Sequence, residues 1–177
     1  MNDNNFIKLN RSCDGFLVPS GDKITLKKDT LVKITQSLGG DFTLYVNGNL
    51  VKISGKDGDA IGKKVEKTIK KEEDFNENII WDTLKTCYDP EIPVNIVDLG
   101  LVYNLITKKI SNNNYYIEIK MTLTAPGCGM GPVIAQDVEN KITNLSFVKD
   151  VLVELVWDPQ WNQDMMTEEA KLKLGMI

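Results

Sequence analysis

One cysteine in this sequence lies where a reactive or metal-binding thiol is expected. Cys128 has a glycine on each side in the segment Thr124-Ala-Pro-Gly-Cys-Gly-Met-Gly-Pro132, between the end of a predicted strand and the start of a predicted helix. Glycine lets the backbone approach a ligand closely, and the N–H groups of a helix start favour an anion or a thiolate. Cys128 is therefore a candidate nucleophile or metal ligand. The alternative is that it is a small buried hydrophobic residue.

A second segment, Tyr88-Asp-Pro-Glu-Ile-Pro-Val94, offers two carboxylates. Its two prolines favour an extended backbone that presents Asp89 and Glu91. These carboxylates could bind a cation or act as a base. The alternative is that Asp89 and the nearby Asp98 only accept hydrogen bonds from backbone N–H groups and cap turns.

The absence of one residue type limits the chemistry further. The chain of 177 residues has three cysteines and no histidine. Catalysis by Ser-His-Asp or Cys-His groups within this chain is therefore excluded, as are zinc sites that need histidine. A four-cysteine zinc or iron–sulfur site within one chain is one ligand short. We expect Cys87 to be buried on a helix face, while the role of Cys13 stays open.

Composition restricts the cellular setting and the partners. No run of 18 apolar residues occurs, and Met1-Asn-Asp-Asn-Asn lacks the basic and apolar stretches of a signal peptide. We therefore expect a cytoplasmic protein with reduced thiols and no membrane contact. Of the 21 basic residues, 20 are lysine, which argues against recognition of nucleic acid by arginine.

The amino-terminal part is predicted to be a β-rich extension over residues 1–62. Residues 16–61 read as a small antiparallel sheet or barrel, with a hairpin at Asn47-Gly48, the strongest short hairpin signal. Residues 63–74 are a charged linker or the first turns of a helix. Residues 1–71 carry a net charge of +5, and residues 72–177 carry −9. The basic charge could dock an acidic partner or simply be solvated.

The carboxyl-terminal part, residues 75–177, is predicted to be an α+β domain. Apolar spacing predicts a helix over 76–88, and strands follow at 101–106 and 115–123 as a hairpin. A helix after Gly131-Pro132 leads to a strand over 150–157, which should run parallel to strand 115–123. The order helix–strand–strand–helix–strand gives one layer of helices on one face of a sheet. A short helix follows from Thr167 to Gly175.

Several motifs, in this order, resemble one family. They are Asp89-Pro-Glu-Ile-Pro-Val94 with Asp98-Leu-Gly-Leu-Val102, then Thr124-Ala-Pro-Gly-Cys-Gly-Met-Gly131, then Trp157-Asp-Pro-Gln-Trp161 and Met166-Thr-Glu-Glu-Ala-Lys-Leu-Lys-Leu-Gly175. The sequence closely resembles the SufT-like iron–sulfur assembly factors, a family shared with PaaD and the cytosolic iron–sulfur targeting factors. Two further segments, residues 36–42 and 46–50, resemble the amino-terminal β-rich extension of SufT. A proline often follows the loop cysteine in the wider family, whereas Gly129 does so here.

The resemblance implies an auxiliary, non-enzymatic role in assembling iron–sulfur clusters or transferring them to client apoproteins. Cys128 matches the motif cysteine of the family, and Asp89, Glu91 and Thr124 match its accompanying polar positions. One thiolate cannot hold a cluster alone. A transient cluster or an iron ion would therefore be bound between chains, either in a homodimer or with a client. The assembly machinery and client apoproteins are the expected partners.

Two other functions remain open. The protein could be a metal-free adaptor that recruits clients to the assembly machinery, with Cys128 structural and the region Trp157–Trp161 facing a partner rather than packing. It could also be a thiol enzyme that uses Cys128 as nucleophile, although no histidine is available as its base.

Overall fold

The computed structural model describes residues 5–65 and 72–177, and the chain divides into two compact units, residues 1–68 and 69–177. Residues 66–71 of the predicted linker, residues 63–74, lie outside the described residues. Among the described helices, none is both long and apolar enough to cross a membrane.

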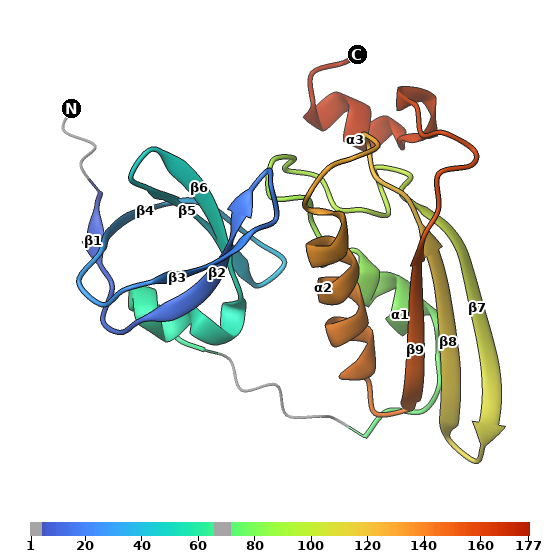
Figure 1. The fold of residues 1–177 in the computed structure, drawn as a ribbon. Helices are drawn as coiled ribbons and strands as arrows, with labels where there is room; N and C mark the ends of the chain where they lie inside the picture. The colour runs from blue at the N-terminus through green and yellow to red at the C-terminus, as the bar shows by residue number, and fades with distance from the viewer. Residues whose placement is uncertain (1–4, 66–71) are drawn as a thin grey trace. The chain divides into compact units, whose positions relative to one another are not determined.

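The first unit is a curled antiparallel sheet of six strands in the order β1-β4-β5-β6-β2-β3 (Figure 1). Its β-rich character was predicted, but two of its elements were missed. Strand pairing begins before residue 16, and residues 55–61, the end of the region predicted as a sheet or barrel, form a 3₁₀ helix, η1. Ser54 starts this helix by accepting a hydrogen bond from the N–H of Lys56. The elements are β1 Ile7–Lys8, β2 Cys13–Val18, β3 Lys23–Leu26, β4 Leu31–Leu38, β5 Asp41–Val46, β6 Asn49–Ile53 and η1 Gly55–Ile61.

The predicted hairpin at Asn47-Gly48 is confirmed. Val46 and Asn49 close the pair of strands β5 and β6, and the two central residues have φ values of 48° and 87°. Both values lie in the left-handed region that a type I′ turn requires and that asparagine and glycine tolerate.

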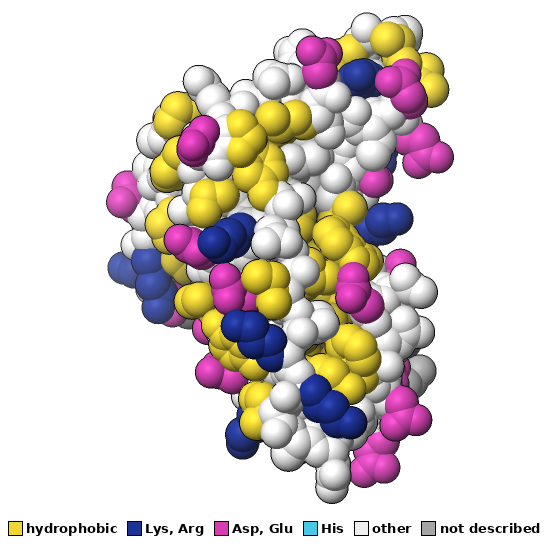
Figure 2. Space-filling view, turned by 90° about the vertical axis from the view of Figure 1, so that its right-hand side faces the viewer, with side chains coloured by type: hydrophobic (Ala, Val, Ile, Leu, Met, Phe, Trp, Pro, Cys, Tyr) yellow, Lys and Arg dark blue, Asp and Glu magenta, His cyan; other side chains and the backbone are white. Residues whose placement is uncertain are grey.

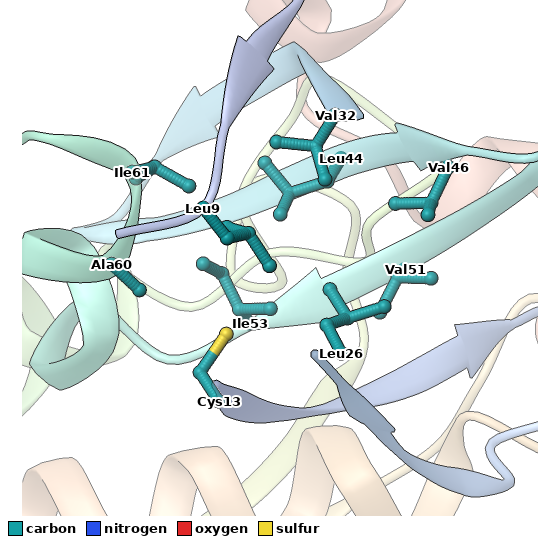
Figure 3. Packing of buried hydrophobic residues seen from close by; sticks show 10 residues of the cluster. All are labelled: Leu9, Cys13, Leu26, Val32, Leu44, Val46, Val51, Ile53, Ala60 and Ile61. Atoms are coloured by element: carbon teal, nitrogen blue, oxygen red, sulfur yellow. The ribbon is translucent and has the colours of Figure 1, made fainter. Parts of the chain in front are cut away.

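The core of this unit is a cluster of buried aliphatic side chains that includes Leu9, Leu44 and Ile53 (Figure 3). Cys13 belongs to this cluster, and burial raises the pKa of its thiol. Cys13 is therefore a structural residue that stays protonated near neutral pH. Beside the core, the buried Lys52 ammonium lies 3.2 Å from the Asp41 carboxylate, which also accepts a hydrogen bond from the N–H of Gly55.

The second unit has the predicted order helix–strand–strand–helix–strand. Strands β7 and β8 are antiparallel, β8 and β9 are parallel, and the sheet order is β7-β8-β9. Both helices cover the same face of the sheet (Figure 1). The elements are α1 Glu77–Leu84, β7 Val102–Ser111, β8 Asn114–Met121, α2 Gly131–Thr143, β9 Val148–Leu155, the 3₁₀ helix η2 Gln163–Met165 and α3 Glu168–Lys173.

Along β8, apolar and polar side chains alternate, and the apolar ones lie on the face of the sheet that the helices cover. Ile117, Ile119 and Met121 are fully buried, as predicted from the alternating pattern, and fully buried residues of α1 and α2 form the rest of the core. The side chains between them on β8 lie on the opposite face. The sheet therefore has one face packed under helices and one face without a helix.

Helix α1 is shorter than the predicted helix over 76–88. Its side-chain cap is Asn76, which accepts a hydrogen bond from the N–H of Asn78. After Leu84 the backbone tightens, because Thr86 and Cys87 donate to carbonyl oxygens three residues earlier at 3.0 Å. Such i→i+3 bonds commonly close a helix. Phe75 lies just before the helix, where its ring stacks on Tyr115 with centroids 3.9 Å apart.

Candidate functional site

Three segments meet at one end of the sheet of the second unit. Strand β7 begins where β8 and β9 end, because Val102 pairs with Met121 and Met121 pairs with Leu155. Residues 88–100 lead into β7, residues 122–130 follow β8, and residues 157–174 follow β9 (Figure 1). We call this end the loop edge. At its centre, the N–H of Thr122 donates to the carbonyl of Leu101 at 2.8 Å.

Cys128 lies in the predicted place, in the loop between β8 and α2. Its side chain is partly exposed, and its carbonyl accepts a hydrogen bond from the N–H of Gly131 at 3.2 Å. Gly131 permits this close packing, because a Cβ there would lie 2.8 Å from Cδ1 of Leu123. Gly127 precedes the cysteine with φ of +79°, a left-handed conformation that favours glycine. The glycines therefore shape the loop that carries the thiol.

The start of α2 offers fewer free donors than a helix start usually does. The N–H of Gly131 already donates to the carbonyl of Cys128, and Pro132 has no N–H. No side chain caps this helix. The thiol of Cys128 itself is therefore the main chemical group that the loop presents.

The two carboxylates of the acidic loop have different surroundings. Asp89 is buried, with 5% of its surface exposed, and its Oδ1 accepts a hydrogen bond from the N–H of Glu91 at 2.9 Å. Its carbonyl accepts from the N–H of Ile92 at 3.1 Å, so Asp89 organises the turn in which it lies. Glu91 is exposed. Thr124 is half-buried near the start of the Cys128 loop. Supporting roles for these three residues beside Cys128 stay predictions.

Asn95 is a structural residue of the loop edge that sequence reasoning missed. Its Oδ1 accepts hydrogen bonds from the N–H groups of Val97 and Asp98, and its amide nitrogen donates to the Asp98 carboxylate at 2.7 Å. In this turn it is therefore Asn95 that accepts the backbone hydrogen bonds, while the Asp98 carboxylate accepts one from the Asn95 side chain. An asparagine followed by a turn is a usable signal for such a local bond.

The carboxyl-terminal segment packs onto the acidic loop. Trp161 donates through Nε1 to the carbonyl of Leu99 at 2.8 Å, and the N–H of Thr167 donates to the carbonyl of Asp98 at 2.9 Å. Gly100, with φ of +73°, lies so close to Met165 that a Cβ would overlap its carbonyl oxygen. Trp161 therefore has a packing role. Trp157, in contrast, is 45% exposed.

The three cysteines differ in their exposure to solvent. Cys87 is fully buried, as predicted, with its sulfur 3.9 Å from the carbonyl oxygen of Thr83, and Cys13 lies in the core of the first unit. Cys128 is the thiol that reaches the surface. Within residues 5–65 and 72–177, no three His, Cys, Asp or Glu side chains gather closely enough to hold a metal ion.

The fold and site define a small α+β domain that presents one thiol on the loop after its central strand. The model of the family described as "Iron-sulfur cluster assembly protein" matches residues 77–155. A relative from Porphyromonas gingivalis, named Fe-S protein maturation auxiliary factor, is 46% identical over 53% of this chain and 86% of its own length. The chain belongs to this iron–sulfur cluster assembly family.

Further relatives agree on the extent of the match. The Fe-S protein maturation auxiliary factor SufT of Staphylococcus aureus is 39% identical over 50% of this chain and 96% of its own length. A crystal structure of a domain of unknown function from Bacillus anthracis has a TM-score of 0.50 and 38% identity, and covers 57% of this chain and 92% of that domain. The family model lies within the second unit, so the first unit is outside it.

Proposed function

We propose that this protein is an auxiliary factor that assists the assembly of iron–sulfur clusters or their transfer to client apoproteins, through the thiol of Cys128 and a protein-docking surface. The observation that carries the proposal is the partly exposed thiol at the loop edge of a domain from this family. The names of the relatives from P. gingivalis and S. aureus support the role in maturation.

The chemistry follows from the number of accessible thiols. A cluster is cargo for such a protein, and each iron needs several thiolate or equivalent ligands. Cys13 and Cys87 are buried and belong to the packing of their units, which leaves Cys128 as the thiol that can reach the cargo. The remaining ligands would come from a second chain or from the client. A ligand set that is incomplete within one chain suits a protein that hands its cargo on.

The docking surface is supported by an exposed aromatic side chain. Trp157 is 45% exposed and follows β9 at the loop edge, where the Cys128 loop also lies. Tryptophan is among the residues that contribute most to protein interfaces. We therefore assign Trp157 to the surface that meets the assembly machinery or a client.

Anaerobic reconstitution with iron and sulfide, followed by visible absorbance, tests the role of the thiol. We expect the wild-type chain to gain a chromophore and Cys128→Ser to lose it. Cys13→Ala is the matched control, because it removes a buried thiol of the other unit and should leave the chromophore unchanged. Full maturation of client proteins by Cys128→Ser would overturn the thiol mechanism.

The metal-free adaptor gives a different set of results. An adaptor would never gain the chromophore, would retain its partners in Cys128→Ser, and would lose them in Trp157→Ala. A thiol enzyme would instead consume a small substrate without any assembly partner. Both assays are carried out under reducing conditions, which match the cytoplasm expected from the sequence.

A further inference from the structure

The sheet of the second unit has a regular array of side chains on the face without helices. Strand register places these side chains in three rows, each crossing β7, β8 and β9. The rows are Lys108, Tyr116 and Asp150; Ile106, Glu118 and Leu152; and Asn104, Lys120 and Glu154. We call these nine residues the open face.

Charge is divided between the two edge strands of the open face. Lys108 lies on β7, while Asp150 and Glu154 lie on β9. In the middle row, the apolar side chains of Ile106 and Leu152 flank Glu118, and Leu152 is 47% exposed. Figure 2 shows apolar side chains exposed among Lys and acidic side chains on this side of the unit. One edge of the face is therefore complementary in charge to the other.

We propose that a second copy of this chain covers the open face, sheet against sheet, about a twofold axis parallel to β8. This rotation lays β7 of each copy over β9 of the other. At the same level, Lys108 then faces Asp150 of the second copy, Ile106 faces Leu152, and Asn104 faces Glu154. Two aligned sheets pack in this way in β-sandwiches, at a small angle.

The other twofold arrangement has less favourable charge pairs. An axis perpendicular to the strands would lay each strand over itself in the opposite direction, so Asp150 would face Glu154 of the second copy. Like charges placed opposite each other are destabilising. In both arrangements Glu118 faces Glu118 of the second copy, and in the one we propose Lys120 also faces its own copy. Each of these two residues lies diagonally across from the opposite charge of the other copy, and Lys120 already lies 3.8 Å from Glu154 of its own chain. The two pairs of Lys108 with Asp150, which only the proposed arrangement forms, therefore decide between the two.

The arrangement bears on the proposed function but does not depend on it. Rotation about an axis parallel to the strands keeps both loop edges at the same end of the dimer, so both Cys128 loops face the same cargo or client. A groove of about 670 Å³ extends the open face toward that end, between Tyr103, Val156 and Met165. Because each copy contributes only three short strands, the surface area buried in the dimer lies at the small end of the range for specific protein–protein interfaces. We expect a dissociation constant of about 1–100 μM.

Sedimentation velocity of the full chain over a range of concentrations tests the dimer. Lys108→Glu and Asp150→Lys should each weaken it by about tenfold or more, because either change creates two repulsive pairs per dimer. An equimolar mixture of the two variants should form a heterodimer as tight as the wild-type dimer, since every pair is then complementary again. Lys109→Glu on β7 and Glu139→Lys on α2 are matched controls, because both lie off the open face, and they should behave like wild type.

The proposal fails if the wild-type chain is monomeric at all concentrations. It also fails if the charge reversals leave the dimer intact or if mixing the variants does not restore it. Should a variant unfold, a zero-length carbodiimide cross-link between Lys108 and Asp150 of ¹⁴N- and ¹⁵N-labelled wild-type copies provides the same test. A monomer that still gains an iron–sulfur chromophore would overturn the dimer alone and leave the proposed function intact.

Discussion

Replacement of Gly100 by alanine tests how the loop edge is held together. Gly100 has φ of +73°, and a Cβ there would overlap the carbonyl oxygen of Met165 in the carboxyl-terminal segment. Gly127→Ala is the matched control, because Gly127 has φ of +79° but no atom within 4 Å of an added Cβ. Both variants place alanine in a left-handed backbone conformation, but only Gly100→Ala also introduces a Cβ that overlaps a neighbouring residue.

The magnitude follows from the contacts that must move. A left-handed conformation costs a residue other than glycine about 1–2 kcal/mol, which applies to both variants. In Gly100→Ala the carboxyl-terminal segment must also shift, and two hydrogen bonds that hold it, from Trp161 to Leu99 and from Thr167 to Asp98, would be lost. Each contributes about 1 kcal/mol. We therefore expect losses of about 1–2 kcal/mol for Gly127→Ala and 3–4 kcal/mol for Gly100→Ala.

Urea denaturation followed by tryptophan fluorescence measures this difference in the full chain. All three tryptophans, Trp81, Trp157 and Trp161, lie in the second unit, so the signal reports that unit alone. Surface substitutions ordinarily change the free energy of unfolding by up to about 0.5 kcal/mol. If the free energies of unfolding of the two variants differ by less than that, the close contact at Gly100 does not hold the carboxyl-terminal segment in place.

Other predictions concern the thiols, acid stability and the start of α2. Thiol labelling of the folded chain should find one fast group, Cys128, because the other two cysteines are buried; equal rates for all three would contradict this. The Arg11 guanidinium lowers the pKa of Asp59, so the stability that this carboxylate contributes is present above its unfolded pKa and is lost as the pH falls through the lower folded pKa. Asp59→Asn should therefore make the folded fraction of the first unit, measured by NMR, depend less on pH in the acid range. An unchanged dependence on pH would refute the pairing of Asp59 with Arg11. Gly131→Ala should lower stability by about 1–2 kcal/mol in the urea assay, because its Cβ would crowd Leu123; an unaffected midpoint would argue against this packing.

Local patterns predicted several elements correctly. The Asn47-Gly48 turn depends on only two φ values, and the alternation of Ile117, Ile119 and Met121 on β8 depends on a period of two. Thr167 begins α3 by accepting a hydrogen bond from the N–H of Ala170, and Gly175 follows it with φ of +71°, as predicted. Each of these signals involves residues close together in the sequence, which is why the sequence was sufficient.

Long-range contacts explain where prediction stopped. The helix predicted over 76–88 was too long, and the 3₁₀ helix over residues 55–61 was missed. Both regions are also held by distant residues, because the N–H of Ile96 donates to the carbonyl of Cys87 and the N–H of Asn10 donates to the carbonyl of Ala60. The inward position of Trp161 depends on a hydrogen bond to a residue 62 positions away. No periodicity in the neighbouring sequence encodes a contact of that kind.

The sequence by itself determined that Cys128 lies in a glycine-rich loop between a strand and a helix, and its motifs indicated the family to which the chain belongs. The tertiary structure decided which thiols are buried, that Asp89 holds its own turn, and that one face of the second sheet carries complementary charges on its two edges. The reason is that burial and strand register arise only when distant segments pack together.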